Sequence, residues 1–118
     1  EIILKSSGLQ KRDFITLFNV CRALDHFIVL DKDLIQDGLF NLGGSCSMQI
    51  IEMANLIALR AEKQLGFYPV ISRPVVKEET FENLEYNIDK IIRTGFDLID
   101  NFEQEIDDTL LFCKKHFS

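Results

Sequence analysis

Two pairs of side chains in this sequence have types and spacings that suit chemistry on a charged ligand. In the first pair, Arg22 and His26 stand four positions apart, and Asp25 directly precedes the histidine. Residues four apart lie on one helix face, and histidine changes charge near neutral pH. A phosphate-accepting histidine needs an exposed helix face and an acidic neighbour, which Asp25 would supply, and Arg22 and His26 are the weak catalytic candidates. The apolar run from Phe27 to Leu30 equally favours a structural histidine.

The second pair, Tyr68 and Arg73, belongs to the stretch 67–77, which contains both prolines of the chain. Proline cannot continue a helix, so we expect a long extended loop here. Loops of this length are often functional or ordered by packing. A ligand-binding protein would place an apolar pocket beneath this loop, with Tyr68 and Arg73 as polar anchors.

Motifs for cofactors and metals are missing from the sequence. It has neither GxxxxGK[ST] nor GxGxxG, and Gly43-Gly44-Ser45 lacks the lysine and the preceding strand of a phosphate loop. Glu-x-x-His pairs, which hold di-iron centres in helix bundles, do not occur, and two histidines are too few for a three-histidine site. We therefore expect no cofactor and no metal.

Length and composition limit the classes of protein to which this chain can belong. The 118 residues suit one domain, 1–118, with 47% apolar and 27% charged residues. The three cysteines are an odd number without CxxC, which indicates a reducing compartment, and we expect a cytoplasmic protein. No apolar run approaches the ~20 residues of a membrane helix, and the first residues do not resemble a secretion signal.

The net charge of −6 is uneven along the chain. Residues 1–77 carry +1 and residues 78–118 carry −7. An acidic segment repels phosphate backbones, and the basic pair Lys11-Arg12 is too small to form a patch. Nucleic acid is thus not expected as the primary partner, nor is a membrane.

Apolar residues recur at three- and four-residue steps, which predicts helices. The first helix is expected over about 9–30. The second is expected over about 33–66, and its apolar rhythm continues through Gly43-Gly44, although a break there remains an alternative. Gly66 is the expected helix end, because glycine readily adopts the left-handed conformation.

The last third of the chain has the most regular apolar stripe and an acidic first turn followed by a basic last turn. A helix of forty residues would be about 60 Å long, so we expect a break near Asp100-Asn101 that gives helices over about 78–100 and 102–117. The predicted fold is all-α: an antiparallel bundle of four to five helices with one long proline-containing loop.

One segment resembles a known family. Residues 33–39, followed by the apolar stretch to Gly66, are similar to the second helix of HEPN-type bundles. That resemblance implies a small helical partner of nucleotidyltransferases or an RNase toxin whose activity requires an arginine and a nearby histidine. Here Arg22 and His26 would have to supply them from the first helix. Residues 80–84 and the helix predicted after them similarly resemble DinB-like bundles, without their metal histidines.

Three hypotheses of function follow. The first is a non-catalytic interaction module that self-associates or binds a partner helix, and so is not an enzyme. Its expected interface is the apolar stripe of the last third: Phe81, Leu84, Ile88, Ile91, Leu98 and Phe102. The second is a HEPN-like protein of a toxin–antitoxin or nucleotidyltransferase-partner type that uses Arg22 and His26. The third is a small-molecule-binding bundle that uses Tyr68 and Arg73.

Overall fold

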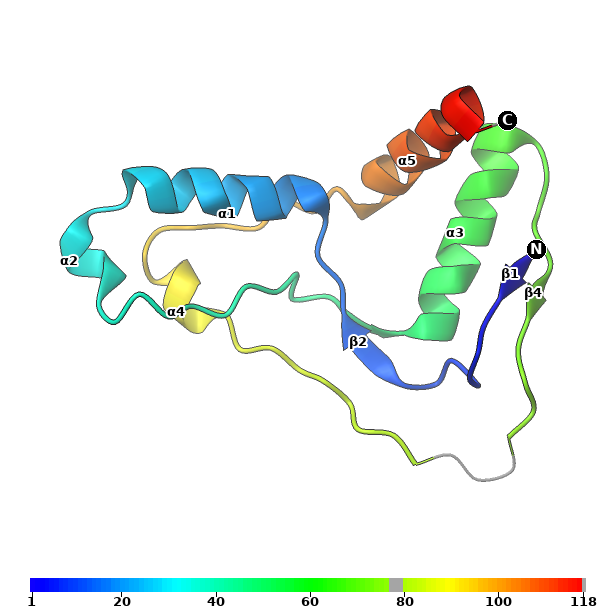
Figure 1. Cartoon of the computed structure of the whole chain (residues 1–118), viewed down its shortest axis with the longest axis horizontal. Helices are drawn as coiled ribbons and strands as arrows, with labels where there is room; N and C mark the ends of the chain where they lie inside the picture. Colours follow the sequence, from blue (N-terminus) through cyan, green and yellow to red (C-terminus); the bar gives the residue numbers. More distant parts are fainter. Residues whose placement is uncertain (77–79, 118) are drawn as a thin grey trace.

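The computed structural model describes residues 1–76 and 80–117 and shows helices together with two small sheets (Figure 1). The helices are α1 (Leu17–Val29), α2 (Lys32–Ile35), α3 (Ile50–Leu65), α4 (Asp89–Ile92) and α5 (Phe102–Phe117). The strands are β1 (Ile2–Ile3), β2 (Lys11–Asp13), β3 (Ser47–Gln49) and β4 (Ile71–Ser72).

The molecule has two arms, which Figure 1 shows side by side. One arm, here called the α1 arm, contains α1, α2 and α4, and the other, the α3 arm, contains α3, α5 and the strands. The radius of gyration is 17.4 Å and the extents are 50 × 40 × 20 Å. A compact domain of this length has a radius of gyration of about 13–14 Å. The chain is therefore open, and its two arms do not close around one core.

In the α3 arm, β2 and β3 pair antiparallel, with Arg12 opposite Met48. The ladder continues through the Phe14 amide, which donates to the Cys46 carbonyl at 3.1 Å. β3 leads directly into α3, whose first turn is closed by a capping box between Gln49 and Glu52. The capping box explains why the chain turns from strand to helix at this point.

The second sheet consists of β1 and β4, which pair in parallel with Ile2 opposite Ile71 and Ile3 opposite Ser72. The Ile2 amide donates to the Val70 carbonyl at 2.8 Å, and the Leu4 amide donates to the Ser72 carbonyl at 2.9 Å. The stretch that contains Tyr68 and Arg73 is thereby tied to the first residues of the chain.

α3 and α5 pack against each other through a buried ion pair. The Arg60 Nε donates to Asp107 Oδ1 at 2.7 Å, a second guanidinium nitrogen contacts Oδ2, and Gln64 also donates to this carboxylate. Asp107 is only 6% exposed. A buried carboxylate needs such partners, because desolvating it without them is costly.

The α1 arm has a small core formed by Ala23, Ile88, Ile91 and Phe96. Ile91 is the only large side chain in the described residues that is fully enclosed, at 0% exposure. Asn19 locks α1 onto the segment before α5, because its side chain donates to the Ile99 carbonyl at 2.8 Å and accepts from the Ile99 amide at 3.0 Å.

The predicted all-α bundle is wrong, and its first two helices show why. Residues 11–13 form a strand within the helix expected over 9–30. The helix expected over 33–66 is interrupted between α2 and α3, and Gln36 and Ser45 adopt positive φ there. Gly44 lies so close to β2 that a Cβ built on it would fall 1.7 Å from the Phe14 carbonyl oxygen. Contact with a distant strand overrides local helix propensity here.

In the last third, the prediction was right for one helix and wrong for the other. α5 spans Phe102–Phe117, as expected for 102–117. Of the helix expected over 78–100, only Asp89–Ile92 is helical, and the predicted start at Glu78 lies outside the described residues. Part of the predicted apolar stripe packs from irregular chain instead, because Ile88 belongs to the core of the α1 arm and Leu98 packs against it.

The predicted helix end at Gly66 is confirmed. Gly66 adopts φ 80° and ψ 15°, and its amide donates to the Glu62 carbonyl. Within residues 1–76 and 80–117, none of the helices has the length and apolar character needed to cross a membrane.

Candidate functional site

The connection between β1 and β2 is tightly folded. Its tight fold requires Gly8, with φ 76°, because a Cβ there would lie 2.9 Å from Leu4 and 3.2 Å from Ile51. The Ser6 and Ser7 hydroxyls accept from the amides of Gly8 and Leu9. The connection is thus held by its own short polar side chains, as in other serine-stabilised turns.

Two arginines are anchored beside this connection by main-chain carbonyls. The Arg73 Nη1 donates to the Ser7 carbonyl at 2.8 Å. The Arg12 Nη1 donates to the carbonyls of Lys11 at 2.8 Å and Glu82 at 3.2 Å. A guanidinium has five N–H donors in a fork that matches phosphate. Carbonyl anchoring of one nitrogen orients each group and leaves its other donors for a ligand.

Three other cations of the described residues are neutralised by carboxylates. Arg22 pairs with Asp97 at 3.0 Å, Arg60 with Asp107 and Glu103, and Lys90 with Asp37. Among the described residues, Arg12 and Arg73 form no ion pair with a carboxylate. In a chain of net charge −6, each of these two guanidinium groups is oriented by a main-chain carbonyl and has no carboxylate partner, so each is a candidate contact for an anion. We call Arg12 and Arg73 the arginine pair.

The glycine-rich turn beside β2 does not fit a phosphate. The Asp13 carboxylate accepts from the Gly44 amide at 2.6 Å and from the Cys46 amide at 3.1 Å. These amides are already bonded, and the carboxylate that binds them would repel a phosphate. The sequence prediction that Gly43-Gly44-Ser45 is not a phosphate loop agrees with this geometry.

Cys46 lies on the same turn but does not suit a nucleophile. Partial burial raises the pKa of its thiol, and the charges of Asp13 and Asp100 raise that pKa further. The reactive thiolate is therefore disfavoured near neutral pH.

The structure brings the predicted catalytic candidates Arg22 and His26 to one shallow depression on α1, beside Phe96. The Arg22 Nη1 also donates to the Asp97 carbonyl at 2.6 Å. The His26 Nε2 lies 2.8 Å from the Thr94 hydroxyl, which itself donates to the Ile91 carbonyl. His26 therefore acts as the donor to Thr94. Both residues fasten α1 to the 91–97 segment, and a catalytic role for them stays a prediction.

The other predicted site residues are separated in space. Of the expected interface stripe, Ile88 and Ile91 are buried in the α1 core and Leu98 packs against it, whereas Phe81 and Leu84 are exposed. Tyr68 is also exposed. A role of the stripe in an intermolecular interface, and of Tyr68 in ligand binding, stays a prediction.

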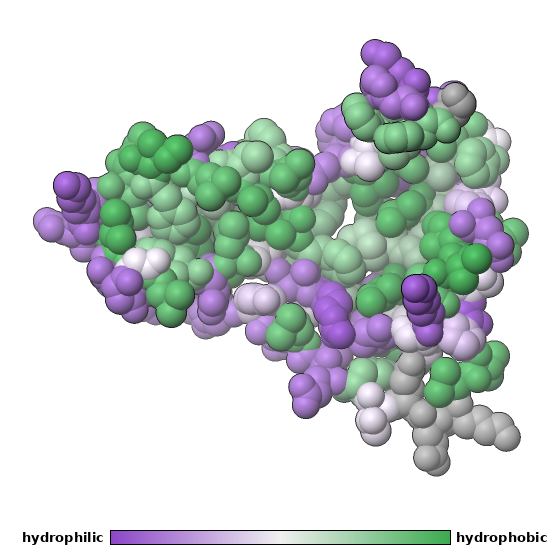
Figure 2. Space-filling view, viewed as in Figure 1, coloured by the Kyte–Doolittle hydropathy of each residue, from purple (hydrophilic) through white to green (hydrophobic). Residues whose placement is uncertain are grey.

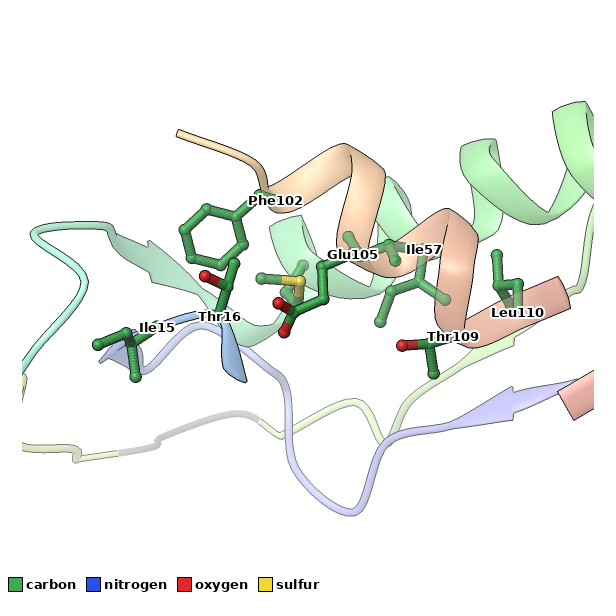
Figure 3. Close-up of a pocket in the computed structure, with 9 residues that line it drawn as sticks. Ile15, Thr16, Ile57, Phe102, Glu105, Thr109 and Leu110 are labelled. Carbon is green, nitrogen blue, oxygen red and sulfur yellow. The ribbon is translucent and has the colours of Figure 1, made fainter. Parts of the chain in front are cut away.

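An apolar pocket lies between the start of α1, α3 and α5, with a volume of about 210 Å³. Figure 3 shows Glu105 reaching from α5 toward Thr16 at the mouth of this pocket. The Glu105 carboxylate accepts from the Leu17 amide at 2.5 Å and the Phe18 amide at 3.0 Å. Glu105 thus caps α1, so its charge is already used within the fold.

Sequence reasoning missed Arg12, Asp13 and Glu105. Arg12 was visible as part of a basic pair but was discounted as too small a cluster. The alternation around Lys11–Asp13 is too short to mark a strand, so nothing placed Asp13 opposite the glycine turn. No sequence signal marks Glu105, because its contact with α1 is made across 88 positions.

No family model matches the sequence, and no curated protein matches it. Two solved structures resemble nearly the whole chain. A UDP-N-acetylglucosamine 4-epimerase from Methanobrevibacter ruminantium M1, in complex with UDP-N-acetylmuramic acid, matches 99% of the chain with a TM-score of 0.73 and 18% identity. A dTDP-glucose 4,6-dehydratase from Bacillus anthracis str. Ames, in complex with NAD, matches 97% with a TM-score of 0.65 and 20% identity.

The likeness shows the fold: this chain has the architecture of part of such enzymes. It spans 36% of the epimerase chain and 34% of the dehydratase chain. The predicted non-catalytic interaction module is therefore wrong, as are the HEPN-like and ligand-binding bundles, because the fold matched is an enzyme fold with sheets. The predicted stripe on which the module rested is not a single helix face.

Proposed function

We propose that this chain is the part of a sugar-modifying enzyme that holds a nucleotide diphosphate sugar. The observation that supports the proposal most is the match of nearly the whole chain to two enzymes named for UDP- and dTDP-linked sugars. These substrates share a diphosphate, which carries negative charge on oxygens spaced for arginine. The arginine pair, Arg12 and Arg73, is the corresponding feature of this chain.

The two guanidinium groups bind and orient the diphosphate. Each keeps one nitrogen on a main-chain carbonyl, so that its remaining N–H groups face the ligand in a defined orientation. Such pre-orientation lowers the entropy lost on binding. The sugar attached to the diphosphate is held in place for chemistry by the rest of the enzyme.

NAD is present in the dehydratase structure, but the residues of this chain do not fit it. The sequence has no GxGxxG, and the amides of the glycine turn are bonded to Asp13. We derive no step through NAD from these residues. The enzyme is proposed to act in the cytoplasm, which the three unpaired cysteines of the described chain support.

Calorimetric titration of the protein with UDP-N-acetylglucosamine and with dTDP-glucose tests the proposal. At least one should bind. Arg12→Ala and Arg73→Ala should each weaken binding about 10- to 100-fold, since a hydrogen bond to a charged group contributes about 1.5–3 kcal/mol.

Arg93→Ala is the matched control, because Arg93 ends α4 in the α1 arm, away from β1 and β2. It should leave the affinity unchanged. The proposal is wrong if the wild-type protein binds neither compound, or if only the Arg93 variant loses affinity.

A further inference from the structure

β2 pairs with β3 along one edge, and a distant side chain bonds to its other edge. The Phe14 amide donates to the Cys46 carbonyl, on the side of β3. Because amides alternate between the two edges along a strand, the Lys11 amide, three positions earlier, points away from β3. It donates to Asn83 Oδ1 at 3.1 Å. Asn83 therefore fills a position at which a third strand would otherwise pair.

The residue before Asn83 contacts Arg12, one member of the arginine pair. The Arg12 Nη1 donates to the Glu82 carbonyl at 3.2 Å. Figure 1 shows the chain before α4 passing β2, and Figure 2 shows mostly hydrophilic residues there. Glu82 and Asn83 are both exposed, so hydrogen bonds rather than buried side chains hold them on β2. We call residues 82–83 the β2 strap.

The β2 strap determines which donors of Arg12 are left for a ligand. The Nη1 atom carries two N–H groups, and two carbonyls accept from it, Lys11 at 2.8 Å and Glu82 at 3.2 Å. The Nε and Nη2 atoms make no hydrogen bond to any other residue that the structure describes. These two atoms form one edge of the guanidinium group, and such an edge binds two oxygens of a phosphate side by side.

The pleat of β2 keeps this edge apart from the nearest carboxylate of the strand. Side chains alternate between the two faces of a strand, so Arg12 and Asp13 point to opposite faces. The Asp13 carboxylate is bonded to the amides of Gly44 and Cys46 on its own face. Arg12 thus presents a free, oriented edge without a competing anion from its neighbour.

We propose that Asn83 is a positioning residue for the diphosphate of the nucleotide sugar. By accepting from the Lys11 amide it holds the β2 strap in place. The Glu82 carbonyl then fixes Nη1 of Arg12, and the Nε–Nη2 edge of Arg12 binds one phosphate group. Asn83 itself does not touch the ligand. The inference rests on the proposed function and names the residue that orients one of its two arginines.

A double-mutant cycle tests this role by calorimetric titration with UDP-N-acetylglucosamine and dTDP-glucose. Asn83→Leu removes the acceptor and should weaken binding about 3- to 10-fold, because Arg12 must then be ordered when the ligand binds. In the Arg12→Ala background the same substitution should change the affinity less than about 2-fold. Asn41→Leu is the matched control and should leave the affinity unchanged, because the exposed Asn41 bonds to the Asn87 carbonyl, away from the β2 strap.

A measurement without ligand separates this inference from the proposed function. The Nε–Hε signal of Arg12 in nuclear magnetic resonance, assigned by its absence in Arg12→Ala, reports how ordered the guanidinium group is. Its heteronuclear NOE should be high in the wild type and in Asn41→Leu, and should fall in Asn83→Leu. Asn83→Asp, which keeps an acceptor for the Lys11 amide, should retain the high value.

An unchanged Arg12 signal in Asn83→Leu would overturn the inference. So would an equal loss of affinity with and without Arg12, because Asn83 would then contact the ligand or support the fold in general. If the Arg12 signal responds as expected but the wild type binds neither nucleotide sugar, Asn83 still positions Arg12, and it is the proposed function that fails.

Discussion

Gly44 shows how a missing side chain can fix the position of a loop. Its backbone lies against β2, where the Asp13 carboxylate binds its amide and the Phe14 carbonyl occupies the space of a Cβ. The close approach is thus needed both for the hydrogen bond and for the ladder between β2 and β3. Any larger residue must push these segments apart.

Replacing Gly44 with alanine should therefore lower the free energy of unfolding by about 3 kcal/mol or more, because a Cβ at 1.7 Å from the Phe14 oxygen forces backbone movement. Urea unfolding followed by circular dichroism measures the loss. Gly66→Ala is the control. A Cβ there meets open space, so the free energy of unfolding should fall only by the strain of a positive φ in alanine, about 1–2 kcal/mol. Equal losses in the two variants would contradict the steric explanation.

Gly66 and Gly44 also show which glycine conformations can be predicted from sequence. Gly66 was correctly predicted as a helix end, because the conformation it adopts is set by its own neighbours. The close backbone contact of Gly44 was not predicted, because Phe14, which it approaches, lies thirty positions earlier in the chain. An apolar rhythm that continued through Gly43-Gly44 favoured a helix, whereas the close contact with β2 decided the structure.

At the scale of elements, the α3–α5 contact depends on the charge of Asp107. Its hydrogen bonds with Arg60 lower the pKa of this carboxyl below its usual range, against the opposing effect of burial. A lowered pKa in the folded state means that the stabilisation is complete above the unfolded pKa of about 3.9 and is lost as the pH falls toward the folded value. We therefore expect stability to fall in acid below about pH 4.

Asp107→Asn should reduce stability at pH 7, because it leaves the buried Arg60 charge with a neutral partner, and should flatten the acid decline. Thermal unfolding between pH 2 and pH 7 measures both effects. Asp108→Asn is the matched control, because Asp108 is exposed and contacts only Gln104 among the described residues. An acid decline as steep in Asp107→Asn as in the wild type would show that other groups cause it.

The N-terminus of α1 is capped by Thr16, and Glu105 of α5 adds acceptors for two further amides, which links the two arms. Glu105→Ala removes the acceptor for the Leu17 and Phe18 amides and should destabilise α1 by about 1 kcal/mol, the usual contribution of a cap. Hydrogen exchange should become faster at the α1 amides and stay unchanged in the second half of α3. Uniform acceleration in both helices would instead indicate global loss of stability.

A helix could be predicted from sequence where its own residues mark both of its ends. α5 has acids in its first turn and Lys114, Lys115 and His116 in its last, and its range was predicted correctly. The stretch before it has equal apolar periodicity, yet only Asp89–Ile92 is helical. Its apolar residues satisfy the α1 core without a continuous helix, and periodicity alone does not distinguish these cases.

For the whole molecule, exposed apolar side chains matter more than the small core. The double substitution Leu24→Gln and Ile28→Gln should lower the free energy of unfolding by about 3–6 kcal/mol if both exposed side chains are buried in a contact with another protein segment. Leu111→Gln should change it by less than about 0.5 kcal/mol. Denaturant unfolding compares them, and equal small effects would mean that Leu24 and Ile28 stay in water.

The expectation of a single domain rested on the chain length, and the expectation of a bundle rested on apolar periodicity. Composition counts apolar residues but does not say which other chain segment covers them. The apolar steps of the first predicted helix favoured a bundle contact, yet Leu17, Cys21, Leu24 and Ile28 are exposed in the structure. In the structure the polar residues of α1 face inward, and only the fold reveals this. The arginine pair was equally hidden, since its two members are 61 positions apart.

The parallel pairing of β1 with β4 affects the order in which the chain can fold during its synthesis. Ile2 pairs with Ile71, which the ribosome adds 69 residues later. At synthesis rates of about 5–20 residues per second, β1 is synthesised about 3–14 s before β4, the strand with which it pairs. During this interval Ile2, Ile3 and Leu4 have no strand to pair with, so a nascent chain halted before residue 70 should be the form most readily bound by chaperones.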